Sequence, residues 1–175
     1  MGTIKAEDFI ESVADAFQYI SYYHPKDFIQ AMSAAYEKEE SPAAKDAMKQ
    51  ILVNSRMSAT GHRPVCQDTG IACAFVKVGM DATFEGGMTI QEMVDEGVRR
   101  AYTNEENPLR ASVLMDPAGK RLNSKDNTPA VVHVEQSHVD GQGVRRGDVF
   151  RTLHADVLEY LARRPRRAVR HAELL

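Results

Sequence analysis

The 175-residue sequence has no tryptophan and only two cysteines, Cys66 and Cys73. Two cysteines make no disulfide framework of the kind that stabilises small secreted domains, so we expect both to be reduced thiols. Long apolar runs are missing as well, and none approaches the roughly 20 residues of a membrane-spanning helix. The amino terminus becomes acidic at Glu7 and Asp8 and has no apolar signal core. These absences favour a cytoplasmic protein that binds no membrane.

A large net charge is also missing. The formal net charge is −3, with 27% charged and 43% hydrophobic residues, which is typical of a globular domain and gives no electrostatic case for nucleic acid. The charge is unevenly distributed, however. Residues 1–135 contain 8 lysines, 6 arginines and 20 acidic residues, whereas residues 136–175 contain no lysine, 8 arginines and 5 acidic residues. We therefore predict a boundary near residue 135, followed by a divergent arginine-rich tail.

Helical periodicity dominates the first third of the sequence. Apolar residues recur at spacings of three and four over residues 5–23 and again over residues 28–36, on either side of Pro25. Serine followed by proline at residues 41–42 is typical of a helix start, with the serine as capping residue. The third predicted helix should turn apolar side chains such as Ile51 toward the interior.

Strands and one more helix are predicted farther along the chain. Residues 71–78 are almost all apolar and lie between glycines, which favours a strand buried on both faces. A threonine and a glutamate with capping-box spacing predict a helix over residues 89–102. Residues 109–115 and 129–135 are predicted strands, with a turn over residues 116–119 after the first. The predicted class is α+β (mixed α/β), with helices first and then a small sheet with helices.

Chemically active side chains gather in the segment from His62 to Gly70. Its sequence, HRPVCQDTG, holds a thiol, a carboxylate, a guanidinium and an imidazole within nine residues. By residue type alone, Cys66 is either a small structural residue or a functional thiol. Polar groups at the mouth of a buried strand are a common arrangement for a ligand site. The segment is therefore a candidate site, and a charged turn beside a strand would have the same sequence features.

Two protease interpretations of this segment are weak. Aspartic-protease chemistry needs two carboxylates about 3 Å apart, and one Asp-Thr-Gly triplet at residues 68–70 could supply them only in a homodimer. The helical amino-terminal third also disagrees with an all-β protease. A cysteine protease needs a general base beside the thiol. His24, His62 and His133 are available, but no local signature supports any of them.

The segments RPVCQDTG at residues 63–70 and NSKDNTPAVVH at residues 123–133 closely resemble the iron–sulfur (class I) fumarate hydratase family. Similar stretches occur at residues 19–25, 54–57, 96–102 and 109–114. The resemblance covers residues 1 to about 135, which we interpret as the amino-terminal part of a hydro-lyase catalytic domain, incomplete relative to the family domain. The α chain of the iron–sulfur tartrate dehydratases, acting with a separate partner chain, is a related alternative.

The resemblance implies a [4Fe-4S] cluster held by three cysteines, with one open iron at which water adds reversibly to fumarate to give malate. Cys66 matches the first cluster ligand, and Gln67 and Asp68 match residues that contact the substrate. Arg110 matches an arginine that binds a substrate carboxylate, a geometry that suits the guanidinium fork. Residues 127–128 are expected to shape the floor of the site. No catalytic acid or base is assigned.

The intact family member is expected to act on a small dicarboxylate as a homodimer, with no nucleic-acid partner. The similarity stops near residue 135, however, where the family continues to two more cluster cysteines and a further domain. One matching thiolate does not hold a four-iron cluster. We therefore expect a truncated or frameshifted fragment that is inactive alone and only marginally stable. Two other classes remain: a non-catalytic subunit that docks on a chain supplying the rest, and a nucleic-acid binder through the arginine-rich residues 163–167, which lack interleaved aromatics.

Overall fold

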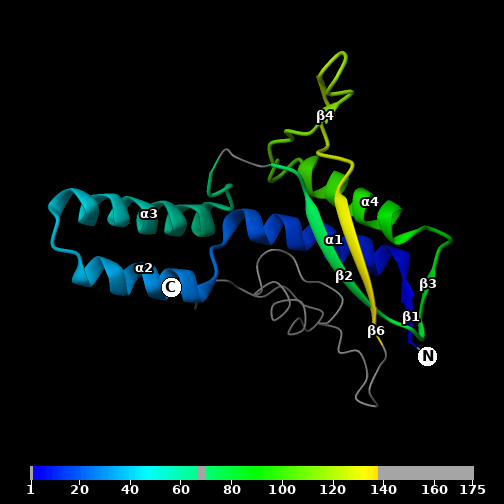
Figure 1. The fold of residues 1–175 in the computed structure, drawn as a ribbon, viewed down its shortest axis with the longest axis horizontal. Helices are drawn as coiled ribbons and strands as arrows, with labels where there is room; N and C mark the ends of the chain where they lie inside the picture. Colours follow the sequence, from blue (N-terminus) through cyan, green and yellow to red (C-terminus); the bar gives the residue numbers. More distant parts are fainter. Residues whose placement is uncertain (1, 67–69, 138–175) are drawn as a thin grey trace.

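The computed structural model describes residues 2–66 and 70–137 of the chain. It contains helices and small sheets, so the fold class is α+β, as the sequence predicts. The elements in chain order are β1 (Gly2–Lys5), α1 (Ala6–Tyr22), α2 (Lys26–Lys38), α3 (Pro42–Gly61), β2 (Cys73–Gly79), β3 (Ala82–Glu85), α4 (Ile90–Tyr102), β4 (Leu114–Met115), β5 (Leu122–Asn123) and β6 (Val131–Ser137). Figure 1 shows α2 and α3 as a hairpin that extends from one end of α1, away from the strands.

The strands form three separate pairs in the described part of the chain. β2 pairs with β6 in parallel, in a register that places Cys73 opposite Val131, and β1 pairs with β3 in parallel. β4 and β5 form an antiparallel hairpin. The predicted turn lies between them, where the amide of Gly119 donates to the carbonyl of Asp116 at 3.0 Å. The sequence predicted neither β1 nor β3.

The hydrophobic core lies among α1, α4 and one face of the β2–β6 pair. Val13 of α1, Val76 of β2 and Met93 of α4 are among its fully buried side chains. α1 and α4 approach each other closely at Gly97, where an added Cβ would lie 2.5 Å from the Cβ of Val13. Real Cβ atoms do not approach a neighbour so closely, so this helix contact requires glycine.

Side-chain capping was predicted at the starts of α4 and α3. The predicted capping box of α4 is confirmed, because the Thr89 hydroxyl accepts from the Glu92 amide at 3.2 Å and the Glu92 carboxylate accepts from the Thr89 amide at 2.7 Å. At the start of α3, Ser41 occupies the capping position but its side chain makes no capping bond in the described chain. The Glu39 carboxylate accepts from the Ser41 amide at 2.8 Å. The predicted helix start, with serine at the capping position and proline at the first helical position, is therefore confirmed without a capping bond from the serine side chain.

The prediction of a strand buried on both faces is wrong. β2 alternates between buried and more exposed positions, and Phe75 is 39% exposed. Among the described residues, helices pack against one face only, and such one-sided packing produces alternation. On the other face the Phe75 ring stacks on His133 with centroids 4.8 Å apart, and Lys77 lies 3.8 Å from the Glu135 carboxylate.

Two further predictions need correction. The predicted strand over residues 109–115 is reduced to β4. Side chains of β5 and of the loop after it, in place of another strand, hold the backbone of residues 111–113. Ile51 of α3 is 41% exposed, and no residue of α2 is buried in the described chain. The α2–α3 hairpin packs on itself and contacts α1, and its apolar stripes remain largely uncovered among the described residues.

Helices long and apolar enough to cross a membrane do not occur among residues 2–66 and 70–137.

Candidate functional site

The chain turns back sharply after α3, at the start of the HRPVCQDTG segment. His62 adopts left-handed backbone angles with φ at 46° and ends the helix. Its ring stacks on Tyr22 with centroids 5.8 Å apart, and its Nε2 lies 3.1 Å from the Tyr23 hydroxyl. The buried Ser58 accepts from the Arg63 amide at 3.2 Å and its hydroxyl donates to the Arg63 carbonyl. These contacts fix the turn against the carboxyl end of α1.

Cys66 follows a residue whose backbone is held from two sides. The amide of Val65 donates to the carbonyl of Ser21 in α1 at 2.9 Å. The carbonyl of Val65 accepts from the Nδ2 of Asn54 in α3 at 2.8 Å. The thiol of Cys66 is exposed, next to this anchored peptide. The position of Cys66 is therefore set by two helices, and its sulfur is accessible to a ligand.

A second anchor lies at Gly70, where the segment leads into β2. The Gly70 carbonyl accepts from the Ser112 hydroxyl at 3.0 Å and from the Nδ2 of Asn127 at 3.3 Å. Gly70 has φ at 55°, a left-handed conformation that glycine adopts at little cost. Just beyond it, the amide of Val131 donates to the carbonyl of Ala72 at 2.8 Å. The two family-like loops therefore meet at the amino ends of β2 and β6.

Arg110 enters the site from a third segment. Leu109 beside it is buried in the core, whereas Arg110 itself is exposed. The backbone after it is held by the loop that follows β5: the Oδ1 of Asn127 accepts from the amide of Ser112 at 2.8 Å and from the amide of Val113 at 3.1 Å. Residues 112–113 are thereby bonded to the same asparagine that binds Gly70.

The structure thus brings together three of the segments that the sequence singled out, which meet at Gly70, at residues 111–113 and at residues 123–127. Cys66 and Arg110 lie on the first two, and both side chains are exposed. Gln67 and Asp68 lie outside the described residues, so their predicted contacts with substrate stay predictions. The expected structural role of Asn127 agrees with its complete burial beneath these segments.

Sequence reasoning missed the contribution of α4 to this arrangement. The Asp95 carboxylate accepts from the Ala130 amide at 2.8 Å, and the Gln91 side chain donates to the Ala130 carbonyl at 3.1 Å. At the end of α4, Tyr102 hydrogen-bonds with Asn127, and burial raises the pKa of its hydroxyl. α4 therefore supports the start of β6 and the floor of the site. No local pattern marks these residues, because polar positions on an amphipathic helix normally face solvent.

The residues present do not fit a complete iron–sulfur cluster site. A [4Fe-4S] cluster is held by several thiolates, and the sequence contains two cysteines. Cys73 lies within β2, where it pairs with Val131. Among residues 2–66 and 70–137, no group of three or more His, Cys, Asp or Glu side chains could hold a metal ion. Cys66 can supply one thiolate ligand. Because Cys73 is the one other cysteine in the sequence, a site of three or more thiolates needs cysteines from outside these 175 residues.

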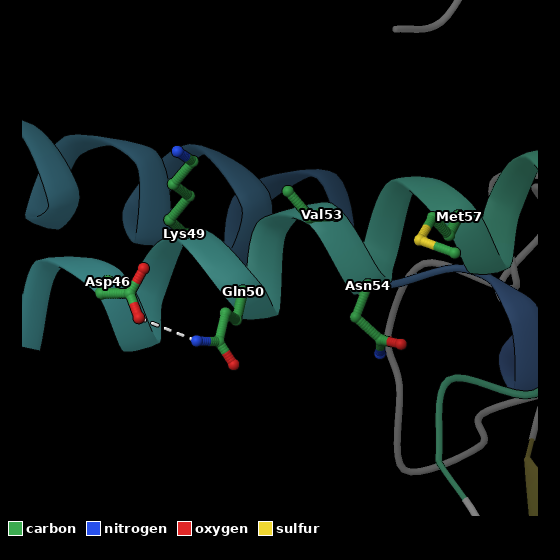
Figure 2. Close-up of a pocket in the computed structure, with 6 residues that line it drawn as sticks. All are labelled: Asp46, Lys49, Gln50, Val53, Asn54 and Met57. Carbon is green, nitrogen blue, oxygen red and sulfur yellow. Dashed lines mark hydrogen bonds between the residues drawn. The ribbon is translucent and has the colours of Figure 1, made fainter.

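A pocket on α3 matches none of the predicted site residues. Figure 2 shows its lining side chains along one helix, with the Gln50 amide donating to the Asp46 carboxylate at 2.8 Å. The lining consists of Asp46, Lys49, Gln50, Val53, Asn54 and Met57. It contains no thiol and no arginine, so the pocket lacks the chemistry that the sequence motifs predict for a dicarboxylate site.

Comparison with known proteins identifies the family of this chain and one similar protein. The family described as "Fumarate hydratase (Fumerase)" matches residues 10–145. The match covers most of the chain, so the protein belongs to this family of hydro-lyases, as the motifs predicted. It extends past residue 135, and the tail that follows the predicted boundary lies mostly outside the described residues.

A protein of Methanocaldococcus jannaschii, "Putative L(+)-tartrate dehydratase subunit alpha", is 36% identical over 102 residues. The aligned region covers 58% of this chain and 35% of that protein. The chain therefore spans about a third of the length of this curated relative.

Proposed function

We propose that this chain supplies part of the active site of a hydro-lyase that adds water reversibly to fumarate. The observation that carries the proposal is the meeting of the Cys66, Arg110 and Asn127 segments in a chain of the fumarate hydratase family. A cytoplasmic location and a homodimer of the intact enzyme belong to the same proposal.

Arg110 is the residue that we assign to substrate binding within the described chain. Its guanidinium offers paired donors that match a carboxylate, and the side chain is exposed on a segment whose backbone is fixed. Gln67 and Asp68 would contact the same dicarboxylate. Cys66 would provide one thiolate ligand of an iron–sulfur cluster, with the remaining ligands lying outside the 175 residues of this sequence.

One finding favours a second candidate. The relative in M. jannaschii is named as the alpha subunit of an L(+)-tartrate dehydratase, and a subunit acts together with other chains. In this alternative the present chain also binds a dicarboxylate through Arg110, but the substrate is tartrate and a separate chain supplies the missing ligands. The two candidates share the binding residues and differ in whether fumarate or L-tartrate is the preferred dicarboxylate.

Calorimetric titration with succinate, a dicarboxylate that cannot be hydrated, tests the shared claim. Arg110→Ala should weaken binding roughly tenfold or more, because a hydrogen-bonded charge pair contributes about 1.5 to 3 kcal/mol. Arg110→Lys should recover only part of the affinity, since an ammonium lacks the paired donors. Arg121→Ala is the matched control, because Arg121 is another exposed arginine on the hairpin that follows.

Equal affinities in Arg110→Ala and Arg121→Ala would contradict the assignment, and so would the absence of succinate binding to the unmodified chain. Under anaerobic conditions with iron and sulfide, we expect the chain alone to leave fumarate unchanged, because it offers a single matching thiolate. Hydration of fumarate by the chain alone would show that no second polypeptide is needed.

A further inference from the structure

Asn127 is a buried amide that bonds to two segments distant in sequence. Its side chain has no exposed surface, and its backbone has φ at 62°, a conformation that asparagine tolerates better than most residues. The Oδ1 accepts from two amides of residues 112–113, and the Nδ2 donates to the Gly70 carbonyl. A buried amide leaves such bonds unmade only at a large cost, so its partners are held in a defined arrangement.

Ser112 reinforces the same link from the opposite segment. Its amide donates to Asn127, while its hydroxyl donates to the Gly70 carbonyl at 3.0 Å. The Gly70 carbonyl thus accepts from both side chains. Ser112 lies two residues after Arg110, and Gly70 lies four residues after Cys66. The Ser112 bond therefore joins the segment of the guanidinium to Gly70 directly, and the Asn127 bond joins it to Gly70 through the loop after β5.

The neighbouring contacts leave these segments little freedom. The Nδ2 of Asn123 donates to the Ala111 carbonyl at 2.8 Å, and the Ser124 amide donates to the Val113 carbonyl at 2.8 Å. The backbone that follows Arg110 is thus bonded to the loop that carries Asn127 at several successive groups. On the thiol side, the Val65 peptide is bonded to α1 and α3. Asn127 and Ser112 bridge two segments that are each fixed locally.

We propose that Asn127 is a positioning residue that, together with Ser112, sets the place of the Arg110 guanidinium relative to Cys66 through the Gly70 carbonyl. The inference rests on the proposed function for the roles of Cys66 and Arg110. Asn127 is fully buried, so it has no exposed surface to offer a substrate. The position matters, since displacement of a binding group by about 1 Å can cost two orders of magnitude in rate.

The test measures this relative placement directly in the full chain, without any ligand. A nitroxide is attached to Cys66 in a Cys73→Ser background, and its relaxation effect on the Arg110 side-chain Nε–H is measured by NMR. Ser112→Ala removes one of the two bonds to Gly70 at an exposed position. Asn127→Asp keeps the acceptors for the amides of residues 112–113 but loses the donor to Gly70. Gln50→Ala, which removes an exposed amide on α3, is the control.

We expect Ser112→Ala and Asn127→Asp each to change the relaxation effect at Arg110 by at least twofold, while core amides such as Val76 and Val98 keep their shifts. Ser112→Thr retains the hydroxyl and should keep the relaxation effect of the unsubstituted chain. Gln50→Ala should leave that effect unchanged as well. Ser112→Ala should also weaken succinate binding, roughly two- to tenfold for one neutral hydrogen bond.

An unchanged relaxation effect in Ser112→Ala would overturn the proposal. Ser112→Ala alone decides the matter if Asn127→Asp, which places a carboxylate in a buried position, fails to fold. The outcome is separable from the proposed function, because the relaxation measurement needs no dicarboxylate. Lack of succinate binding to the unmodified chain would contradict the hydro-lyase assignment and leave the relaxation result as a test of the positioning role.

Discussion

The tight contact between α1 and α4 at Gly97 gives the sharpest prediction about the fold. An added Cβ at this position would lie 2.5 Å and 2.6 Å from the Cβ and Cγ1 of Val13, and 2.9 Å from the carbonyl oxygen of Ile10. Val13 is fully buried, and neither its Cβ nor a helix carbonyl can rotate away. Gly97→Ala therefore forces the two helices apart in the centre of the core.

The net effect on stability has two opposing contributions. Alanine favours a helix interior over glycine by about 1 kcal/mol. Overpacking a core typically costs about 1 to 3 kcal/mol, and a contact with immovable atoms belongs at the upper end. The difference predicts that Gly97→Ala lowers the free energy of unfolding by about 2 kcal/mol. For a chain of this size that corresponds to a decrease in Tm of roughly 4 to 8 °C.

The assay is urea and thermal unfolding of the full chain, monitored by circular dichroism. Gly61→Ala provides the matched control, since Gly61 ends α3 and an added Cβ there would meet only the Arg63 side chain at 3.9 Å. This control should leave stability unchanged or raise it by up to about 1 kcal/mol. A Gly97→Ala variant as stable as Gly61→Ala would refute the close packing of α1 against α4.

Two further predictions concern pH. Hydrogen bonds with Arg100 lower the pKa of the carboxyl of Glu7, and hydrogen bonds with Arg99 and Arg100 lower that of Glu96. The stability from these pairs is present above the ordinary glutamate pKa and is lost as pH falls through the lowered pKa values. Arg100→Ala should therefore make the free energy of unfolding in urea less sensitive to acid. Identical acid profiles of the variant and the unsubstituted chain would contradict this. Burial raises the pKa of Tyr22 to about 12, and its hydroxyl donates to the Asn107 carbonyl at 3.2 Å. The stability that the buried Tyr22 hydroxyl contributes is complete below the ordinary tyrosine pKa and is lost as pH rises through about 12. Tyr22→Phe should therefore flatten the alkaline limb of the unfolding profile. An unaltered alkaline limb would speak against this prediction.

Much of the fold follows from local patterns in the sequence. The apolar spacing of residues 5–23 and the capping box of Thr89 and Glu92 predict α1 and α4 well, because helix periodicity and capping are local properties. β1 and β3 escaped prediction, since each has four residues and gains its hydrogen bonds from a partner about 80 positions away. The exposure of Phe75 could not be predicted either, because a short apolar run does not show how many faces of a strand are covered.

The candidate site was predictable in its parts and not in its assembly. Cys66 and Arg110 could be picked out by resemblance, because motif and spacing suffice for that. The two hydrogen bonds at the Gly70 carbonyl could not be predicted, because their donors lie 42 and 57 positions away from Gly70 in the sequence and come close only in the tertiary fold. Ser112 in particular lay in a predicted strand, where a hydroxyl has no expected partner.

The central claim is that the Cys66, Arg110 and Asn127 segments form one dicarboxylate site. Its most direct test is an NMR titration of the isotope-labelled chain with succinate, with shift changes followed at every assigned amide and at the Arg110 Nε–H. We expect the largest changes at Cys66, Gly70 and residues 110–113, and we expect the α3 pocket around Lys49 to stay unperturbed. Changes centred on that pocket, or no change at saturating succinate, would contradict it.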